Sequence, residues 1–537
     1  EVGFIFQLAP SQLKEQIVEG KELAVVDVRS GGAFAGNHLL YAISIPLANL
    51  ELEVGCLIPR LETPIVLCDD ASGLADIAVV RLTEFGYTQV NILDGGIGAW
   101  EKAGYEIFSG VNVPSKAFGE FVEHKYGTPR LPAAEIKAKL DAGENIVILD
   151  SRPMKEFTSM SIPGGICCPG AELAYRVSDA VEDPQTLVVV NCAGRTRSII
   201  GAQSLINAGI PNPVVALENG TMGWHLAGYG LDHGQVRHAP NVTENGLERS
   251  RKMADTVAKR FGVEKVSSAD LERFRTQTSE ITLFVLDVRS PEEYVAGHLP
   301  GSRSAPGGQL VQATDEYVGV RNARLVLVDD TGVRATMTAS WLIQMGWDNV
   351  YVLDGVLVET DLETGPERRE VLGLKNLDVQ LIKVSALNDL ITEKNTVVID
   401  LSDSLEFRAG HIPSARRASR TGLEEVLEKI GGDNLTFVLT SPDGILAKFA
   451  AAEVSHREDL KVCVLDGGIE AWTDAGYARE SGDDPDAGEL SEDVWYKPYQ
   501  QTDAIEEAMH AYLTWEIALV EQIERDGTTR FRHFHPS

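Results

Sequence analysis

The clearest pattern in the chain is a short apolar, β-branched run that ends in an aspartate and occurs four times. The four runs are Ala24–Arg29, Ile146–Arg152, Leu283–Arg289 and Val397–Ser402. They are spaced by about 100–150 residues, which is the size of one small domain. A repeat at this interval predicts tandem structural units, each built around the same buried strand.

Each run is followed by the same series of patterns. A helix-length stretch leads to a turn, a second apolar strand leads through a polar loop to an amphipathic helix, and a third strand ends at an acidic residue. The second strands are Pro64–Leu67, Leu187–Val190, Leu325–Val328 and Thr436–Leu439, and the third are Ile92–Gly95, Ala216–Asn219, Val352–Gly355 and Val464–Gly467. In three copies a tryptophan follows the acid, at Trp100, Trp224 and Trp472.

Short apolar strands that alternate with helical segments of about ten to fifteen residues are typical of a parallel sheet with helices on both faces. We therefore predict an α/β protein of four tandem units, at residues 1–109, 110–237, 238–373 and 374–481. Helical connectors are expected at 118–126 and 253–261, leading into the second and third units.

The composition changes in residues 482–537. An acidic stretch, which we interpret as a solvated linker, contains Asp483, Asp484, Asp486, Glu489, Glu492 and Asp493. Beyond it, apolar residues between 503 and 524 have the spacing of one amphipathic helix. We expect this helix to dock on the fourth unit or on a second copy of the chain, so a homo-oligomer is one expected state.

Charge and composition narrow the class of protein. The chain has 537 residues and a formal net charge of −32, which disfavours binding to nucleic acid or to an anionic membrane. It contains no uninterrupted apolar run of about 18 residues, so no membrane span is predicted. Six cysteines over this length are too sparse for a disulfide scaffold, which favours a reducing compartment, and we expect the cytoplasm.

The repeated pattern resembles the rhodanese family. Each unit has parts of an Asp-x-Arg strand end, a Gly-His-Ile-Pro-Gly-like turn, a loop after the second strand, and a Leu-Asp-Gly-Gly-x-x-x-Trp ending. The resemblance extends from Ala24 to Tyr477. It implies four tandem rhodanese-like domains, in which the loop after the second strand carries a cysteine that receives sulfur.

Only the second unit keeps that cysteine. An ungapped alignment of the four loops places Cys192 opposite Asp69, Asp329 and Ser441. Cys68 of the first unit falls one position early, at the end of a strand, where its side chain points to the other face. The resemblance therefore implies one catalytic unit and three inactive ones.

The second loop has the properties of an anion site. It consists of Cys192, Ala193, Gly194, Arg195, Thr196, Arg197 and Ser198. A strand-to-helix loop directs several backbone N–H groups at one centre, and the helix adds its positive dipole end. We therefore expect the pKa of the Cys192 thiol to lie below its ordinary value, and Arg195 and Arg197 to bind an anionic donor through forked hydrogen bonds.

The predicted chemistry is transfer of a sulfane sulfur. The Cys192 thiolate takes sulfur from thiosulfate or a related small anionic donor, holds it as a persulfide, and passes it to a thiol or to cyanide. A protein that accepts sulfur is a further expected partner. Neither a metal nor an organic cofactor is required.

Residues outside the loop are given supporting roles. We expect Asp150 and Arg152 to form an ion pair near the loop, and Arg176 to face the substrate as a cation. The neighbouring Cys167 and Cys168 are expected to be buried structural residues. His38, His298 and His411 recur at one turn, which indicates hydrogen bonding within the fold.

Two alternatives stay open. A rhodanese-like phosphatase or arsenate reductase would use a loop of this kind to surround a tetrahedral oxyanion, but the spacing from Cys192 to Arg197 is one residue shorter than the Cys-x5-Arg loop of such enzymes. A non-enzymatic sulfur carrier or scaffold would explain why three of the four units lack the nucleophile.

Overall fold

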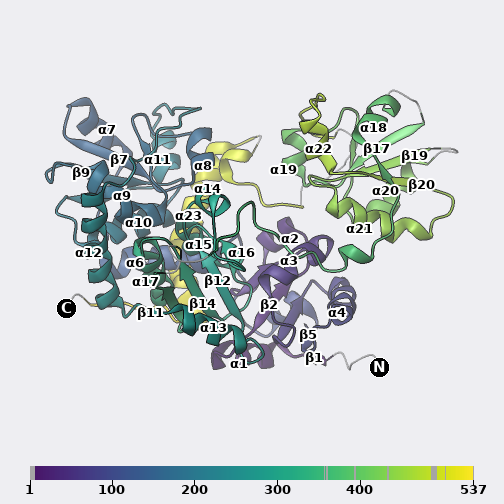
Figure 1. Ribbon diagram of the computed structural model, residues 1–537, viewed down its shortest axis with the longest axis horizontal. Coiled ribbons are helices and arrows are strands. Elements are labelled where there is room, and N and C mark those ends of the chain that lie inside the picture. The colour runs from purple at the N-terminus through teal and green to yellow at the C-terminus, as the bar shows by residue number, and fades with distance from the viewer. Residues whose placement is uncertain are drawn as a thin grey trace.

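Four copies of one sheet follow each other along the chain. The computed structural model describes residues 6–355, 357, 361–391, 395–431, 435–484, 493–501 and 503–535. In this part of the chain the sheets are parallel and five-stranded, with orders β1-β5-β4-β2-β3, β6-β10-β9-β7-β8, β11-β15-β14-β12-β13 and β16-β20-β19-β17-β18 (Figure 1). The order is the same in all four, so the predicted tandem α/β architecture is confirmed.

The elements of the four units correspond one to one over most of their length. The first has β1 (Phe6–Leu8), α1 (Pro10–Glu19), β2 (Ala24–Asp27), α2 (Gly31–Gly36), β3 (Ala42–Ser44), α3 (Leu50–Leu57), β4 (Ile65–Cys68), α4 (Leu74–Glu84), β5 (Val90–Leu93) and α5 (Gly96–Lys102). The second has β6 (Arg130–Leu131), α7 (Ala133–Asp141), β7 (Ile146–Asp150), α8 (Met154–Ser159), β8 (Ile166–Cys167), α9 (Leu173–Ala180), β9 (Leu187–Asn191), α10 (Thr196–Ala208), β10 (Val214–Leu217) and α11 (Gly220–Leu226).

The third and fourth units repeat this series. The third has β11 (Glu264–Val266), α13 (Ser268–Thr276), β12 (Leu283–Asp287), α14 (Pro291–Ala296), β13 (Arg303–Ser304), α15 (Gly307–Gln312), α16 (Thr314–Tyr317), β14 (Arg324–Val328), α17 (Val333–Gln344) and β15 (Val350–Leu353). The fourth has β16 (Leu381–Ile382), α18 (Val384–Leu390), β17 (Thr396–Asp400), α19 (Ser404–Ala409), β18 (Arg416–Arg417), α20 (Leu423–Ile430), β19 (Thr436–Thr440), α21 (Ile445–Glu453), β20 (Lys461–Leu465) and α22 (Gly468–Asp474). Each sheet lies inside one of the four predicted ranges.

The sequence pattern found the three central strands of each sheet and missed the two outer ones. The outer strands are only two or three residues long, as in β1 and β8. Such a strand is too short to show a periodic pattern of burial.

The repeated tryptophans fix the end of three units. The indole Nε1 of Trp100, Trp224 and Trp472 donates a hydrogen bond to a backbone carbonyl six residues later, at 2.9, 3.0 and 2.9 Å. All three rings are buried. A buried indole N–H needs an acceptor, so each ring fixes the chain that leaves its domain.

Three longer helices lie outside the repeated units. They are α6 (Val113–Tyr126), α12 (Glu244–Phe261) and α23 (Ile505–Asp526). Helices α6 and α12 begin several residues before the predicted connectors and end where predicted. Helix α23 matches the predicted C-terminal helix to within two residues at each end.

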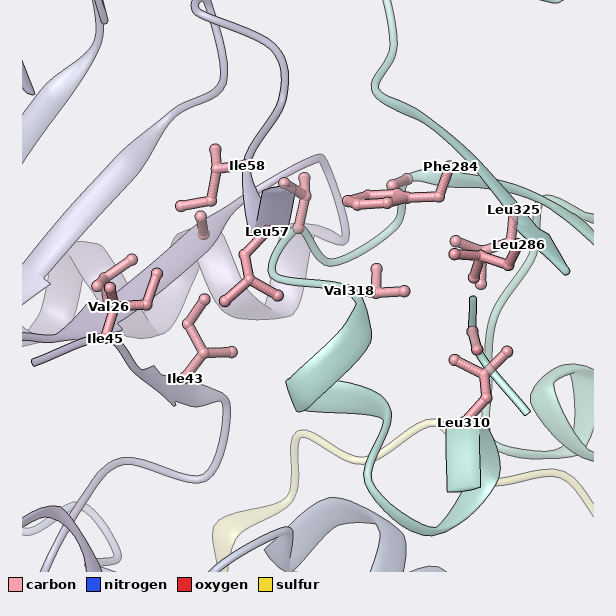
Figure 2. Packing of buried hydrophobic residues seen from close by; sticks show 14 of the residues in the cluster. Val26, Ile43, Ile45, Leu57, Ile58, Phe284, Leu286, Leu310, Val318 and Leu325 are labelled. Carbon is pink, nitrogen blue, oxygen red and sulfur yellow. The ribbon is translucent and has the colours of Figure 1, made fainter. Parts of the chain in front are cut away.

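One hydrophobic core runs through the first and third units and also includes Phe118 and Val122 of α6 and Ile199 and Ile200 of α10. Figure 2 shows side chains from the two units facing each other, with Leu57 and Ile58 on one side and Val318 and Phe284 on the other. The backbones also meet, because the Gly319 N–H donates to the Leu57 carbonyl at 3.1 Å. A Cβ at Gly319 would lie 2.7 Å from that oxygen, so only glycine permits this approach.

The fourth unit has hydrophobic cores of its own. It lies apart from the second unit in Figure 1, and its core residues, such as Leu439, cluster only with residues of its own region. Its contact with the first unit is charged: the Arg420 guanidinium donates to Glu51 at 2.7 and 3.0 Å, and Glu51 also accepts from Arg81 at 3.0 Å.

The C-terminal helix docks on a different surface from the predicted one. Leu519 and Ile523 of α23 pack against Phe108 and the buried face of α6, and Leu513 packs against Met222 of the second unit. The expected docking on the fourth unit is therefore wrong. The spacing of apolar residues identifies the buried face of a helix, but it does not identify what covers that face. Here the cover comes from the same chain.

The acidic stretch is paired where the structure describes it. Asp486, Glu489 and Glu492 lie outside the described residues. Asp493 accepts hydrogen bonds from the Ser404 N–H at 2.7 Å and from Arg417 at 2.8 Å. The interpretation as a solvated linker is therefore wrong for Asp493, because a carboxylate next to a fixed cation binds it in preference to water.

The shared core predicts that the first and third units unfold together. Leu327 and Leu439 occupy equivalent positions in β14 and β19, and both are fully buried. Leu327→Ala and Leu439→Ala should each lower the free energy of unfolding by about 2–5 kcal/mol. Hydrogen exchange should accelerate in both the first and third units of Leu327→Ala, and only in the fourth unit of Leu439→Ala. Acceleration confined to the third unit of Leu327→Ala would contradict the shared core.

Candidate active site

The Cys192 loop connects the central strand of the second sheet to its longest helix. Cys192 follows the last residue of β9, and α10 begins at Thr196. The start of α11 holds the loop from the other side: the Thr221 N–H donates to the Cys192 carbonyl at 2.8 Å, and the Met222 N–H donates to the Ala193 carbonyl at 2.9 Å. The first two residues of the loop are thus fixed by backbone hydrogen bonds from α11.

The Cys192 thiol is almost completely buried, with 2 % of the residue exposed. Its sulfur lies 3.5 Å from the Ser198 hydroxyl oxygen. Burial raises the pKa of the thiol, and the nearby Arg197 and the hydrogen bonds from Ser198 offset this only in part. The expected lowering of the pKa is therefore wrong, because the loop excludes water more completely than the sequence indicated.

Arg197 is one of the two arginines that the sequence predicts to bind the anionic donor. Its guanidinium donates to both oxygens of Glu156 at 2.9 Å and to the Gln309 side chain at 3.1 Å. Burial alone would raise the pKa of Glu156, but the ion pair with Arg197 lowers it to about 2. Arg197 therefore places a positive charge near the thiol and links the second unit to the third. Like Arg195, it is bound by side chains of the protein, and its forked contact with an anionic donor stays a prediction.

Arg195 has a different role from the predicted one. Its guanidinium donates to Glu120 at 2.6 and 2.7 Å and to Glu123 at 2.6 Å, two carboxylates on α6. It also reaches the Asn219 side-chain oxygen at 3.2 Å. The structure uses this cation to attach the loop to α6, so the prediction that Arg195 clamps an anion finds no support in its contacts.

The supporting residues form separate contacts. Arg152 donates to Asp150 at 2.9 and 2.7 Å, and both side chains are buried, as expected for an ion pair within the fold. Arg176 donates to Glu172 at 2.6 Å and to the Pro240 carbonyl at 2.9 Å. Neither of these partners belongs to the Cys192 loop. A contact of Arg176 with substrate stays a prediction.

The neighbouring Cys167 and Cys168 and the repeated histidines are buried parts of the fold. Burial raises the pKa of Cys167 to about 12 and that of Cys168 well above its ordinary value. The histidines stack on an aromatic ring and bond a backbone carbonyl through Nδ1; they are His38, His298 and His411. In the parts of the chain that the structure describes, no group of three or more histidine, cysteine or acidic side chains could hold a metal ion.

In the first and third loops a carboxylate occupies the anion position. Asp329 accepts the N–H groups of Gly332, Arg334 and Ala335, the last two at 2.9 and 3.2 Å. Asp69 accepts three loop N–H groups in the same way, at 2.9, 3.1 and 3.1 Å. These loops satisfy their own N–H groups with an internal anion.

The second loop leaves the corresponding groups open. Arg195 and Arg197 follow Cys192 by three and five residues. Gly332 and Arg334 follow Asp329 of the third unit by the same intervals. Among the described residues, the backbone N–H groups of Arg195 and Arg197 have no hydrogen-bond acceptor. Backbone N–H groups that have no acceptor at the N-terminus of a helix are suited to bind an anion from outside the chain.

The first loop also differs in length. Its helix α4 begins five residues after Asp69, whereas α10, α17 and α21 begin four residues after the aligned position. Counted from the strand, Asp69 stands opposite Cys192 as predicted; counted from the helix, Asp70 does. The ungapped alignment therefore misses one inserted residue in the first unit. In the fourth unit the Ser441 hydroxyl accepts one N–H group among the described residues, that of Ala447, at 3.3 Å.

The sequence analysis missed the residues that cover the loop. The Tyr512 ring and the Glu516 carboxylate of α23 lie over Gly194, and Lys116 of α6 lies beside them. Tyr512 and Glu516 are one turn apart within the buried face of α23. A polar pair in an otherwise apolar stripe is the signal that could have identified them.

Comparison with known proteins identifies the family. The profile of the Rhodanese-like domain family matches residues 9–103, 132–227, 269–359 and 383–475. The chain belongs to the rhodanese family. A solved structure of a thiosulfate sulfurtransferase from Pseudomonas aeruginosa shares 47 % sequence identity and a TM-score of 0.93, over 99 % of this chain and 100 % of that one.

Curated relatives match single units. Thiosulfate sulfurtransferase GlpE of Shewanella oneidensis is 31 % identical over 88 residues, which are 16 % of this chain and 85 % of that protein. The HTH-type transcriptional regulator Rv0324 of Mycobacterium tuberculosis is 32 % identical over 110 residues, which are 20 % of this chain and 47 % of the regulator. Throughout the described residues, every helix is too short or too polar to cross a lipid bilayer.

The environment of Cys192 predicts how it reacts with pH. Because burial raises the thiol pKa, carbamidomethylation of Cys192 by iodoacetamide should have its midpoint at a higher pH in the folded protein than in the unfolded chain. Ser198→Ala removes a hydrogen bond that stabilises the thiolate and should shift the midpoint further upward. The rates are measured by peptide mass spectrometry across pH. A midpoint below that of the unfolded chain would show that the loop N–H groups dominate over burial.

Proposed function

We propose that this protein is a sulfurtransferase in which Cys192 carries the sulfur. The observation that carries the proposal is the contrast between the loops. In the first and third units an aspartate fills the cradle of N–H groups, and in the second a thiol stands at the same place with two of these groups open. The similarity over the whole chain to a thiosulfate sulfurtransferase supports this reading.

The reaction has two halves. The Cys192 thiolate attacks the outer sulfur of thiosulfate, the S–S bond of the donor breaks, and sulfite leaves with the bonding electrons. The new persulfide sulfur carries a negative charge, and in this proposal the backbone N–H groups of Arg195 and Arg197 donate hydrogen bonds to it. A thiol or cyanide then removes the sulfur. Thiosulfate is the donor we propose, and a protein acceptor is compatible with the same chemistry.

The other three units have a structural part in this proposal. Asp69 and Asp329 cannot form a persulfide, and their carboxylates would repel an anionic donor. The third unit still contributes to the site, because its Gln309 accepts a hydrogen bond from Arg197. We propose that the inactive units position the second loop and limit access to it.

The proposal predicts one sulfur atom per chain. Brief exposure of the reduced protein to thiosulfate should add about 32 Da to the intact mass, with release of sulfite, and cyanide should reverse the gain. Cys192→Ser should show neither the gain nor the release. Cys68→Ser is the matched control and should behave as the wild type. A folded protein with a reduced Cys192 that gains no sulfur from thiosulfate or mercaptopyruvate would refute the proposal.

Arg197 should be needed for the first half-reaction. Arg197→Gln removes the positive charge that stabilises the Cys192 thiolate, and the loss of about 1.5–3 kcal/mol of such stabilisation should lower kcat/KM for thiosulfate roughly 10- to 100-fold. Arg334→Gln is the matched control, because Arg334 stands at the equivalent place in the third unit and is also buried. Both variants should lose stability, and only Arg197→Gln should lose sulfite release per folded molecule. An equal loss in both would contradict a direct role of Arg197.

A further inference from the structure

The C-terminal helix places a buried carboxylate over the Cys192 loop. Glu516 is 1 % exposed, although it lies 320 positions along the chain from Thr196, which it contacts. Its Oε1 accepts from the Tyr512 hydroxyl at 2.9 Å and from the Thr196 hydroxyl at 3.3 Å, and lies 3.5 Å from the Lys116 ammonium. One oxygen of this carboxylate is thus held by three groups from α6, α10 and α23.

The other oxygen of Glu516 has no partner. Oε2 is buried and makes no hydrogen bond to any residue that the structure describes. A Cβ built on Gly194 would lie 3.2 Å from Oε2 and 3.4 Å from the Tyr512 ring, so the free oxygen lies against the loop two residues after Cys192. Leaving a buried carboxylate oxygen unpaired costs free energy. A ligand that donates a hydrogen bond to Oε2 would offset this cost.

The Lys116 ammonium and a hollow lined by Met222 lie near Glu516. Lys116 balances its charge, so the carboxylate adds little repulsion towards an anionic donor. A hollow of about 850 Å³ lies between α11 and the residues that lead into α23, and Met222 lines it. A Cβ at Gly194 would lie 2.9 Å from the terminal methyl group of Met222, so the flexible Met222 side chain stands between this hollow and the part of the loop next to Oε2.

We propose that Glu516 is the general base for the acceptor thiol in the second half-reaction. This inference rests on the proposed sulfurtransferase function. A thiol must lose its proton to become the nucleophile, and a base within hydrogen-bond reach provides for this. Oε2 takes the proton from the acceptor S–H, and the acceptor sulfur bonds to the outer persulfide sulfur. The S–S bond to Cys192 breaks, its electron pair stays on the Cys192 sulfur, and the proton passes from Glu516 to that sulfur.

The test separates acceptors that carry a proton from acceptors that do not. Wild type and Glu516→Gln are loaded with sulfur from thiosulfate, freed of donor, and mixed with 2-mercaptoethanol, with sulfite, or with 4-nitrothiophenol, a thiol already ionised at mildly alkaline pH. Loss of the added sulfur is followed by intact mass. Glu524→Gln, the same change at an exposed site on the same helix, is the control.

Glu516→Gln should slow transfer to 2-mercaptoethanol by about 10²-fold or more, the usual worth of a general base. Transfer to sulfite and to 4-nitrothiophenol should stay within a few-fold of wild type. The rate with 2-mercaptoethanol should also rise more steeply with pH in the variant, because only the preformed thiolate then reacts. Glu524→Gln should match the wild type with all three acceptors.

Two results would overturn the inference while leaving the proposed function intact. Equal rates of transfer to 2-mercaptoethanol in wild type and Glu516→Gln would show that the carboxylate takes no proton. Equal slowing with all three acceptors would show that Glu516 only supports the loop. Failure of the wild type to acquire sulfur would instead refute the sulfurtransferase function itself.

Discussion

The backbone N–H groups between the central strand and the following helix need an acceptor, and the units differ in the atom that stands in front of these groups. A carboxylate oxygen does so in the first and third units, where Asp69 and Asp329 bind their own loops. In the second unit the sulfur of Cys192 stands at this place and leaves two N–H groups open. The same backbone geometry thus gives either a closed structural turn or a site for an external anion, and one side chain decides between them.

The surroundings of the second loop follow from this arrangement. A loop that binds an anion must also keep its conformation when no anion is bound. Contacts from three directions stabilise that conformation. Arg195 attaches the loop to α6, Arg197 attaches it to the third unit through Gln309, and α23 covers Gly194. The burial that results raises the pKa of the Cys192 thiol, so rigidity of the loop and ready ionisation of its cysteine oppose each other.

Local pattern in the sequence was enough to predict the four units, their central strands and the position of Cys192. These depend on apolar periodicity and on residues adjacent in the chain. The failures concern partners far apart in sequence. Nothing near Arg195 indicates that Glu120 would bind it, and the spacing within α23 could not reveal that α6 covers its apolar face. The free energy of such contacts depends on how the domains assemble, which a local pattern does not contain.

The core shared by the first and third units has a consequence for the history of the chain. Leu57 and Ile58 are covered by residues of the third unit, and Phe284 and Val318 by residues of the first. Removal of either unit would expose the apolar surface of the other to water. A unit without the cysteine is therefore still required by its neighbour, and selection can retain its gene segment for folding alone.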